Sequence, residues 1–403
     1  MAFFCELRVY SFLIGRAFDV FSSGMIMMAL PWLMLKQGVS GTWVALVALA
    51  CTLSAFVLTP IFATWIDRCS RKSLMVGVQA TQSSMALLLY CIGLAGDISF
   101  FWMAVAQWVF WVSNDLGWAT SNALVQENFT SKEYPKISSL KEVIGQSVMI
   151  SAGAAGVLLL ESWSMQAFAL FATVCSAMGL ILFSLMPYRR SLRQKNHSKF
   201  FQQMLESREI IQRNRSLMLF FALSCLSYPM ITFLIKLVPI YLMEYGYSGN
   251  WFAIWKTVQG TGAICCGIFA VLLLQRFKEE HLMVYATWGV AILLAVMGLF
   301  LQPIVLVATT LVFGFCTTLN RIARIKAMNL TVEVNERGRV DGVLTLFSTF
   351  AQSLSYVLIA ILAHYHLVEY GFLIMALIMA IAATGMRVLQ KGLCVNCGFG
   401  ASV

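Results

Sequence analysis

The chain has 403 residues, of which 60% are hydrophobic and only 11% are charged, and its formal net charge is +10. Soluble domains are about one quarter charged, so this composition excludes an ordinary soluble protein and predicts a chain that crosses a membrane many times. In a membrane protein, positive residues gather in the loops on one side of the membrane, and we attribute the net charge to such loops. Nucleic acid is therefore not expected as a partner.

Apolar spans long enough to cross a bilayer follow one another along the whole sequence. They predict an all-α membrane protein with twelve transmembrane helices, which places both termini on one side. The expected spans are 9–35, 41–66, 73–94, 100–124, 137–160, 163–186, 217–243, 251–274, 282–301, 304–325, 340–364 and 368–387.

The basic residues indicate the orientation of these spans. If the N-terminus is cytoplasmic, Lys36 is the only Lys or Arg in an outside loop, and the positive-inside rule then predicts that both termini are cytoplasmic. Arg16 and Asp19 interrupt the first apolar run, so we interpret it as a span and not as a signal peptide. A basic linker divides the chain into an N-terminal half, the linker itself, a C-terminal half and a cytoplasmic tail: 1–187, 188–215, 216–389 and 390–403.

The loop between the second and third spans carries four charged residues, Asp67, Arg68, Arg71 and Lys72. Their order resembles the gating loop between helices 2 and 3 of the major facilitator superfamily, which reads Gly-x-x-x-Asp-Arg-x-x-Arg-basic. Ala63 stands at the glycine position of this pattern. The resemblance implies two six-helix pseudo-repeats in which helices 1, 4, 7 and 10 line a central cavity.

Further stretches are similar to one branch of that superfamily, the bacterial enterobactin exporter and the macrolide efflux proteins. These stretches are 28–32, 145–146 and 337–340. In the fifth span the antiporters of the superfamily carry Gly-x-x-x-Gly-Pro-x-x-Gly. Here Gly145, Gly153 and Gly156 are predicted to allow close helix packing, while the proline and its kink are missing.

Ionisable residues inside membrane spans are costly and mark functional sites. Most of them fall on helices that, by the resemblance, line the cavity, and we expect them to converge on one aqueous vestibule. Asp115 is the first candidate for proton coupling and Asp19 the second. Arg16 lies three residues before Asp19, so the two share a helix face and form either a structural salt bridge or a functional pair. The expected substrate-binding residues are Arg16, Asn114, Lys236, Arg321 and Arg324.

The excess of arginine in this set suits an anionic substrate. The sequence therefore predicts a monomeric, proton-coupled exporter of an anionic hydrophilic metabolite, such as a carboxylate siderophore, in a bacterial inner membrane. The alternatives are a drug or macrolide efflux pump, suggested by Trp108 and Trp118 among other tryptophans, and an importer of an iron-siderophore.

No zinc-protease, nucleophile-elbow or phosphate-loop motif is present, so neither enzymatic activity nor a cofactor is expected. The Cys394 and Cys397 pair lacks a second pair to complete a metal site, and no metal is expected.

Overall fold

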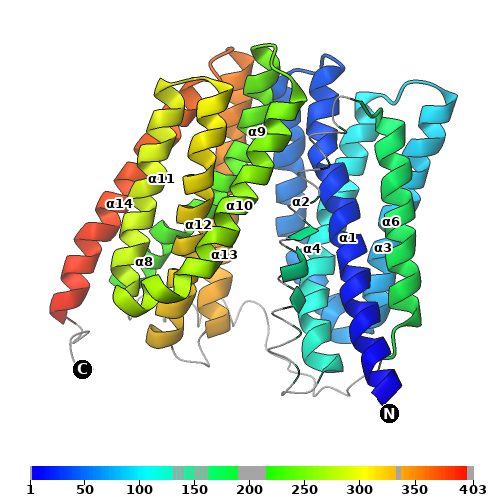
Figure 1. Cartoon of the computed structure of the whole chain (residues 1–403), viewed down its shortest axis with the longest axis horizontal. Helices are drawn as coiled ribbons and strands as arrows, with labels where there is room; N and C mark the ends of the chain where they lie inside the picture. The colour runs from blue at the N-terminus through cyan, green and yellow to red at the C-terminus, as the bar shows by residue number, and fades with distance from the viewer. Residues whose placement is uncertain are drawn as a thin grey trace. The chain divides into compact units, whose positions relative to one another are not determined.

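The computed structural model describes residues 2–129, 162–188, 215–332 and 337–396, together with single residues and short runs between 133 and 159. This part of the chain is helical almost throughout (Figure 1). Its helices are α1 (Ala2–Lys36), α2 (Gly41–Arg68), α3 (Arg71–Ala95), α4 (Phe100–Asn128), α6 (Met165–Leu185), α8 (Arg215–Cys225), α9 (Ser227–Glu244), α10 (Gly249–Arg276), α11 (Glu279–Leu299), α12 (Pro303–Thr331), α13 (Arg337–His364) and α14 (Tyr370–Asn396).

Local sequence features set many of the helix ends. Ser70 and Ser164 cap α3 and α6, because each side chain accepts a hydrogen bond from the backbone N–H three residues later. Pro303 begins α12, where its missing N–H costs nothing. Gly38 and Gly246 take positive φ angles of 83° and 70° in the turns after α1 and α9, a conformation that suits glycine.

The seventh span is divided into α8 and α9 at Leu226. Pro229 has no N–H and cannot donate to the carbonyl of Cys225, so one helical hydrogen bond is missing at this place. Leu226 N–H instead bonds the carbonyl of Leu223 at 3.2 Å, three residues back. The interruption lies three residues before Pro229, where the missing donor of this proline disrupts a helix.

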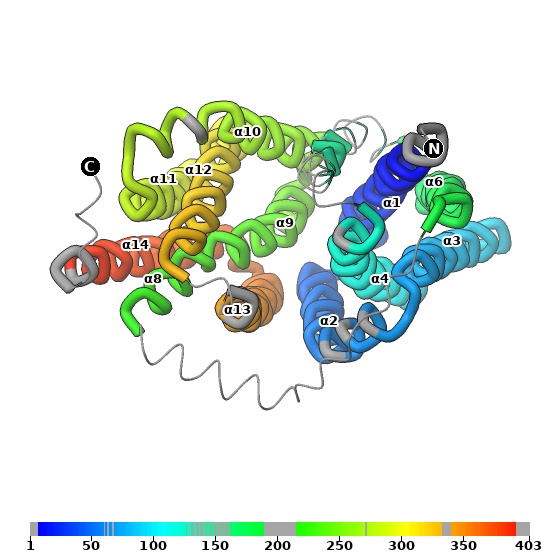
Figure 2. The backbone as a smooth tube through the Cα atoms, turned by 90° about the horizontal axis from the view of Figure 1, so that it is seen from below, coloured from blue at the N-terminus to red at the C-terminus, as the bar shows by residue number. Residues whose placement is uncertain are grey.

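The chain forms two compact units. The first contains Met1–Arg193 and Leu242–Thr257, and the second contains Gln194–Tyr241 and Val258–Val403. Within the first unit α6 packs on α1 and α3, and α3 packs on α4; within the second, α14 packs on α8 and α11, and α11 packs on α12 (Figure 2). Each unit therefore repeats the same neighbour relations, as expected of pseudo-repeats.

Nine helical segments in the described part of the chain are long and apolar enough to cross a membrane. The outer faces of these segments are apolar: exposed side chains of α6, for example, are Leu170, Val174, Met178, Ile181 and Leu185. The predicted all-α membrane architecture is confirmed. Much of the fifth predicted span lies outside the described residues. α4 and α10 are not among the nine, and polar residues interrupt the apolar run of each.

Candidate functional site

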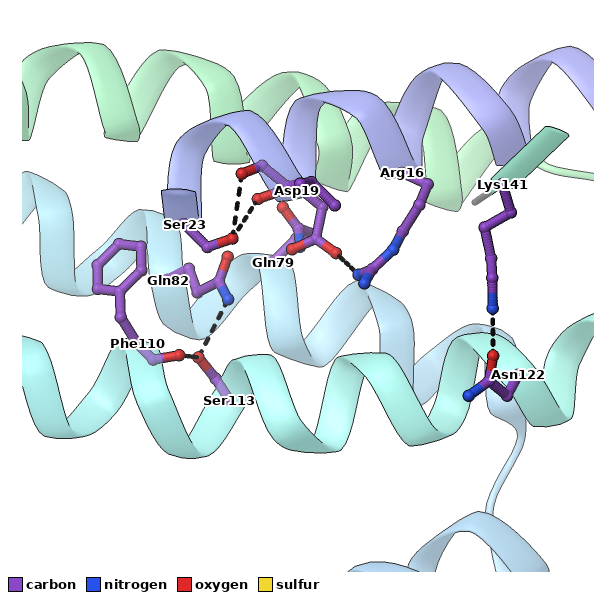
Figure 3. A network of polar contacts seen from close by, with 10 residues as sticks. Arg16, Asp19, Ser23, Gln79, Gln82, Phe110, Ser113, Asn122 and Lys141 are labelled. Carbon is purple, nitrogen blue, oxygen red and sulfur yellow. Dashed lines mark hydrogen bonds and ion pairs between the residues drawn. The ribbon is translucent and has the colours of Figure 1, made fainter. Parts of the chain in front are cut away.

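Arg16 and Asp19 form a buried ion pair on α1. Their spacing of three places them on one helix face, and Arg16 Nη1 donates to Asp19 Oδ2 (Figure 3). Only 5% of Arg16 and none of Asp19 is exposed. Gln79 Nε2 on α3 donates to the other carboxylate oxygen, Asp19 Oδ1, at 2.6 Å. Both oxygens of Asp19 therefore have partners inside the first unit.

The surroundings of this pair are polar but closely packed. Gln79 lies against α6 at Gly179, where an added Cβ would come within 2.7 Å of Gln79 Oε1. Ser22 Oγ on α1 bonds Ser176 Oγ on α6 at 2.7 Å. Hydrogen bonds thus join α1, α3 and α6 around Asp19, and its carboxylate lies in the core of the unit and not on an accessible face.

Asp115 lies elsewhere, on the face of α4 that points away from the packed core. The buried residues of α4, such as Phe110, Gly117 and Leu124, lie on the opposite side of the helix. The Asp115 side chain is exposed, and among the described residues it has no hydrogen-bond or ion-pair partner. Its neighbour Asn114 is half-buried. The two predicted proton-coupling carboxyls therefore stand in different surroundings.

Lys141 joins Asp115 on this side of α4. The sequence pattern counts Lys141 among the inner-loop charges, although it is the fifth residue of the predicted span 137–160. In the structure it is helical, and its Nζ donates to Asn122 Oδ1 of α4 (Figure 3). The same Nζ lies 5.9 Å from the ring centroid of Trp118. Asp115, Trp118 and Asn122 follow one another at spacings of three and four, so they share one helix face.

Three predicted substrate-binding residues belong to the second unit. Lys236 on α9 is buried, with 3% of its surface exposed. Arg321 and Arg324 on α12 differ: Arg321 is exposed, whereas Arg324 is half-buried and its Nη1 donates to Ser224 Oγ on α8 at 3.4 Å. Ser224 also donates to Asn320 Oδ1, so Arg324 is attached to a buried polar contact between α8 and α12.

The predicted gating loop ties the start of α3 to its neighbours. Arg71 Nη1 donates to the carbonyl of Ala123, and Arg71 Nε lies 3.5 Å from Glu127 Oε2 near the end of α4. Lys72 Nζ donates to the carbonyl of Met186, just beyond α6, at 2.8 Å. Arg68 is exposed.

Other predicted positions are only partly described. The side chains of Asp67 and Ala63 lie outside the described residues, as do Gly153 and Gly156. At Gly145 an added Cβ would meet no described atom within 4 Å. The structure thus brings Arg16 and Asp19 together and separates Asp115 from both. The functional roles assigned to these residues from the sequence stay predictions.

Comparison with known proteins gives one family and many structures. The Major Facilitator Superfamily matches residues 12–280. A crystal structure of the nucleoside transporter NupG superposes with a TM-score of 0.77 at 12% identity, covering 95% of this chain and 99% of that one.

Two further similar structures show comparable coverage. A bacterial homologue of the iron transporter ferroportin has a TM-score of 0.73 at 15% identity, covering 94% of this chain and 98% of the other. A D-xylose-proton symporter has a TM-score of 0.70 at 12% identity, covering 95% and 98%. The comparison with curated protein sequences gives no match. At these identities the likeness establishes the fold alone, and the substrate has to be argued from the residues.

Proposed function

The chain belongs to the major facilitator superfamily, and we propose that this transporter is a proton-coupled exporter of an anionic, hydrophilic small molecule. The fold supports transport, and the placement of Asp115 supports proton coupling. A carboxyl group that is accessible and has no fixed partner takes up and releases a proton without breaking an ion pair. Asp19 would first have to leave both Arg16 and Gln79. Asp115 is therefore the favoured proton carrier.

The anionic character of the substrate is inferred from the accessible cations. Arg16 is neutralised by Asp19 in the core of its unit, so it adds nothing to the field of an aqueous cavity. Arg321 is exposed on α12, and Lys141 lies on the same side of α4 as Asp115. Taken separately within each unit, Lys141 in the first and Arg321 and Arg324 in the second support an anionic substrate. A carboxylate siderophore is the narrower candidate that the resemblance adds.

We further propose that the protein is a monomer in a bacterial inner membrane, with both termini cytoplasmic. The distribution of Lys and Arg between alternate loops supports this orientation. A drug efflux pump is the second candidate function, and the exposed Trp118, with 57% of its surface accessible, favours it. A susceptibility panel distinguishes the two, because only the efflux pump should change resistance to macrolides and other drugs.

The test compares a gene deletion with strains that produce the wild type, Asp115→Asn or Asp115→Glu. Anionic metabolites are quantified in cells and medium under iron limitation. We expect one anion to accumulate inside the deletion strain and the Asn strain and to leave cells that carry the wild type. Asp115→Glu keeps a carboxyl and should restore part of the export. If the deletion leaves secretion unchanged, the protein is not an exporter of such an anion. The direction of transport is then measured as flux in right-side-out and inside-out vesicles, and inward flux would identify an importer.

A further inference from the structure

The chain leaves α6 in an extended conformation because of Pro187. A residue before proline avoids helical angles, and Met186 has φ −62° and ψ 125°. The carbonyls of Met186 and Pro187 therefore lie beyond the end of the helix. Lys72 Nζ donates to the first of them at 2.8 Å, and Asn128 Nδ2 donates to the second at 3.1 Å. This exit segment, Met186–Tyr188, is thus attached to the start of α3 and to the end of α4.

The hydroxyl of Tyr188 completes a closed set of contacts at the same place. It donates to Glu127 Oε2 at 2.6 Å and accepts from the backbone N–H of Arg71 at 3.3 Å. Arg71 Nε in turn lies 3.5 Å from the same carboxylate oxygen. The N–H of Arg71 belongs to the first turn of α3, where a helix has no internal acceptor. One hydroxyl therefore serves both the start of α3 and the end of α4.

The bond from Tyr188 holds the carboxylate of Glu127 beside Arg71. The two charged side chains are 5% and 6% exposed, and Arg71 Nε makes no hydrogen bond to a described residue. The ion pair therefore depends on where the flexible glutamate side chain places its carboxylate. A hydroxyl at 2.6 Å forms a charge-assisted hydrogen bond, which favours one rotamer of the glutamate over the others.

We propose that Tyr188 is a positioning residue of the predicted gating loop. It is the first residue of the linker predicted at 188–215, and Arg71 and Lys72 are the last two charged residues of that loop. The start of the linker thus supports the loop: while the exit segment stays in place, Glu127 is held against Arg71. This inference goes beyond the proposed function, because it concerns the support of the loop and not the substrate.

The test measures hydrogen–deuterium exchange in the full-length protein in lipid nanodiscs, without any substrate. Tyr188→Phe keeps the ring and removes the hydroxyl. Two backbone amides that bond within their own helices report the effect: Leu74 N–H bonds the Ser70 carbonyl at 3.0 Å, and Phe129 N–H bonds the Val125 carbonyl at 3.2 Å. We expect both to exchange about tenfold faster or more, because a hydrogen bond to a charged group is lost.

Tyr241→Phe is the matched control. The hydroxyl of Tyr241 donates to the carbonyl of Leu301 at 2.7 Å, in the second unit. Its removal also deletes one tyrosine hydrogen bond, and it should leave the exchange of the Leu74 and Phe129 amides unchanged. If Tyr241→Phe accelerates these amides as much as Tyr188→Phe does, the effect is a general loss of stability and the positioning role is overturned.

Two further variants follow the coupling. Lys72→Met removes the donor to the Met186 carbonyl at the other end of the exit segment, and it should accelerate exchange at Phe129 of α4 by a smaller factor. In a Glu127→Gln background, Tyr188→Phe should accelerate Phe129 less than it does in the wild type, because the group it positions is altered. Wild-type exchange at Phe129 in Lys72→Met or in folded Tyr188→Phe overturns the inference, as do independent effects of Tyr188→Phe and Glu127→Gln.

The outcome is independent of the export experiment. If exchange at Leu74 and Phe129 depends on Tyr188 but the deletion strain secretes normally, the positioning role stands and the proposed exporter fails. If Asp115→Asn abolishes export while exchange ignores Tyr188, only the positioning role is wrong.

Discussion

Asp19 on α1 accepts a 2.6 Å hydrogen bond from Gln79 Nε2 on α3 while its second carboxylate oxygen faces Arg16. The pair is buried, and among the described residues Arg16 is paired with Asp19, whose carboxylate also accepts from the Gln79 amide. Removing one partner leaves an uncompensated charge in the core, which ordinarily costs about 3–5 kcal/mol.

We therefore expect Asp19→Asn to lower the thermal unfolding temperature of the purified protein strongly. The double variant Arg16→Met/Asp19→Leu removes both charges with side chains of similar size and should be more stable than Asp19→Asn alone. Unfolding in detergent, followed by differential scanning fluorimetry, measures both. If Asp19→Asn unfolds at the wild-type temperature, the ion pair does not stabilise the unit.

Each unit has an ion pair between the start of one helix and the end of the next, with the signs exchanged. In the first unit Arg71 begins α3 and pairs with Glu127 near the end of α4; in the second, Glu279 begins α11 and its Oε1 lies 2.6 Å from Lys326 Nζ of α12. Only the second arrangement agrees with the helix dipoles, which favour an acid at the N-terminus and a base toward the C-terminus. The charges of the first unit oppose both dipoles, so each depends on its partner.

These pairs should respond differently to mutation. The Arg71 and Glu127 side chains are 6% and 5% exposed, whereas Lys326 is 42% exposed. Glu127→Gln should therefore cost about 3 kcal/mol or more, and Lys326→Gln about 1 kcal/mol or less. The exchange Arg71→Glu/Glu127→Arg restores the ion pair and agrees with the dipoles. It also removes the bonds from Arg71 to the Ala123 carbonyl and from the Tyr188 hydroxyl to Glu127, so it should recover only part of the stability lost in Glu127→Gln. Equal losses for Glu127→Gln and Lys326→Gln would contradict this ranking.

α10 and α12 cross at two glycines in the second unit. A Cβ added to Gly262 would overlap the carbonyl oxygen of Leu311, and one added to Gly314 would overlap the carbonyl oxygen of Gln259. Backbone cannot move aside as a flexible side chain does, so Gly262→Ala and Gly314→Ala should separate the helices and cost about 1–3 kcal/mol or more.

The matched control for this crossing is Gly267→Ala, also on α10. There an added Cβ meets no described atom within 4 Å, and alanine favours the helix over glycine. Its yield and unfolding temperature should equal or slightly exceed those of the wild type. A loss of folded protein in Gly267→Ala as large as in Gly262→Ala would show that α10 rejects any substitution and that the close crossing is not the cause.

Local features were predictable from the sequence and distant contacts were not. The third span was expected at 73–94, and α3 is Arg71–Ala95. The two agree because the bounds of this helix depend on the length of the apolar run and on a capping serine, which are both local features of the sequence. The contact of Arg16 with Asp19 follows from their spacing of three. The bond from Gln79 to Asp19 joins residues 60 positions apart, and that from Lys141 to Asn122 joins residues 19 apart. No periodicity encodes such pairs, so Lys141 was counted as a topological charge and its position beside Trp118 was missed.

The proposed orientation can be tested at Cys69, which is exposed between α2 and α3. If the N-terminus is cytoplasmic, this loop is cytoplasmic and the next loop, which contains the exposed Asp97, lies on the opposite side. A membrane-impermeant maleimide should label Cys69 in inside-out vesicles and leave it unlabelled in intact spheroplasts, as read by mass spectrometry of the Cys69 peptide. The variant Asp97→Cys should show the reverse pattern, because one span separates the two positions. If Cys69 is labelled in spheroplasts and Asp97→Cys is protected there, the proposed orientation is wrong. The loops rich in Lys and Arg would then lie outside the cytoplasm.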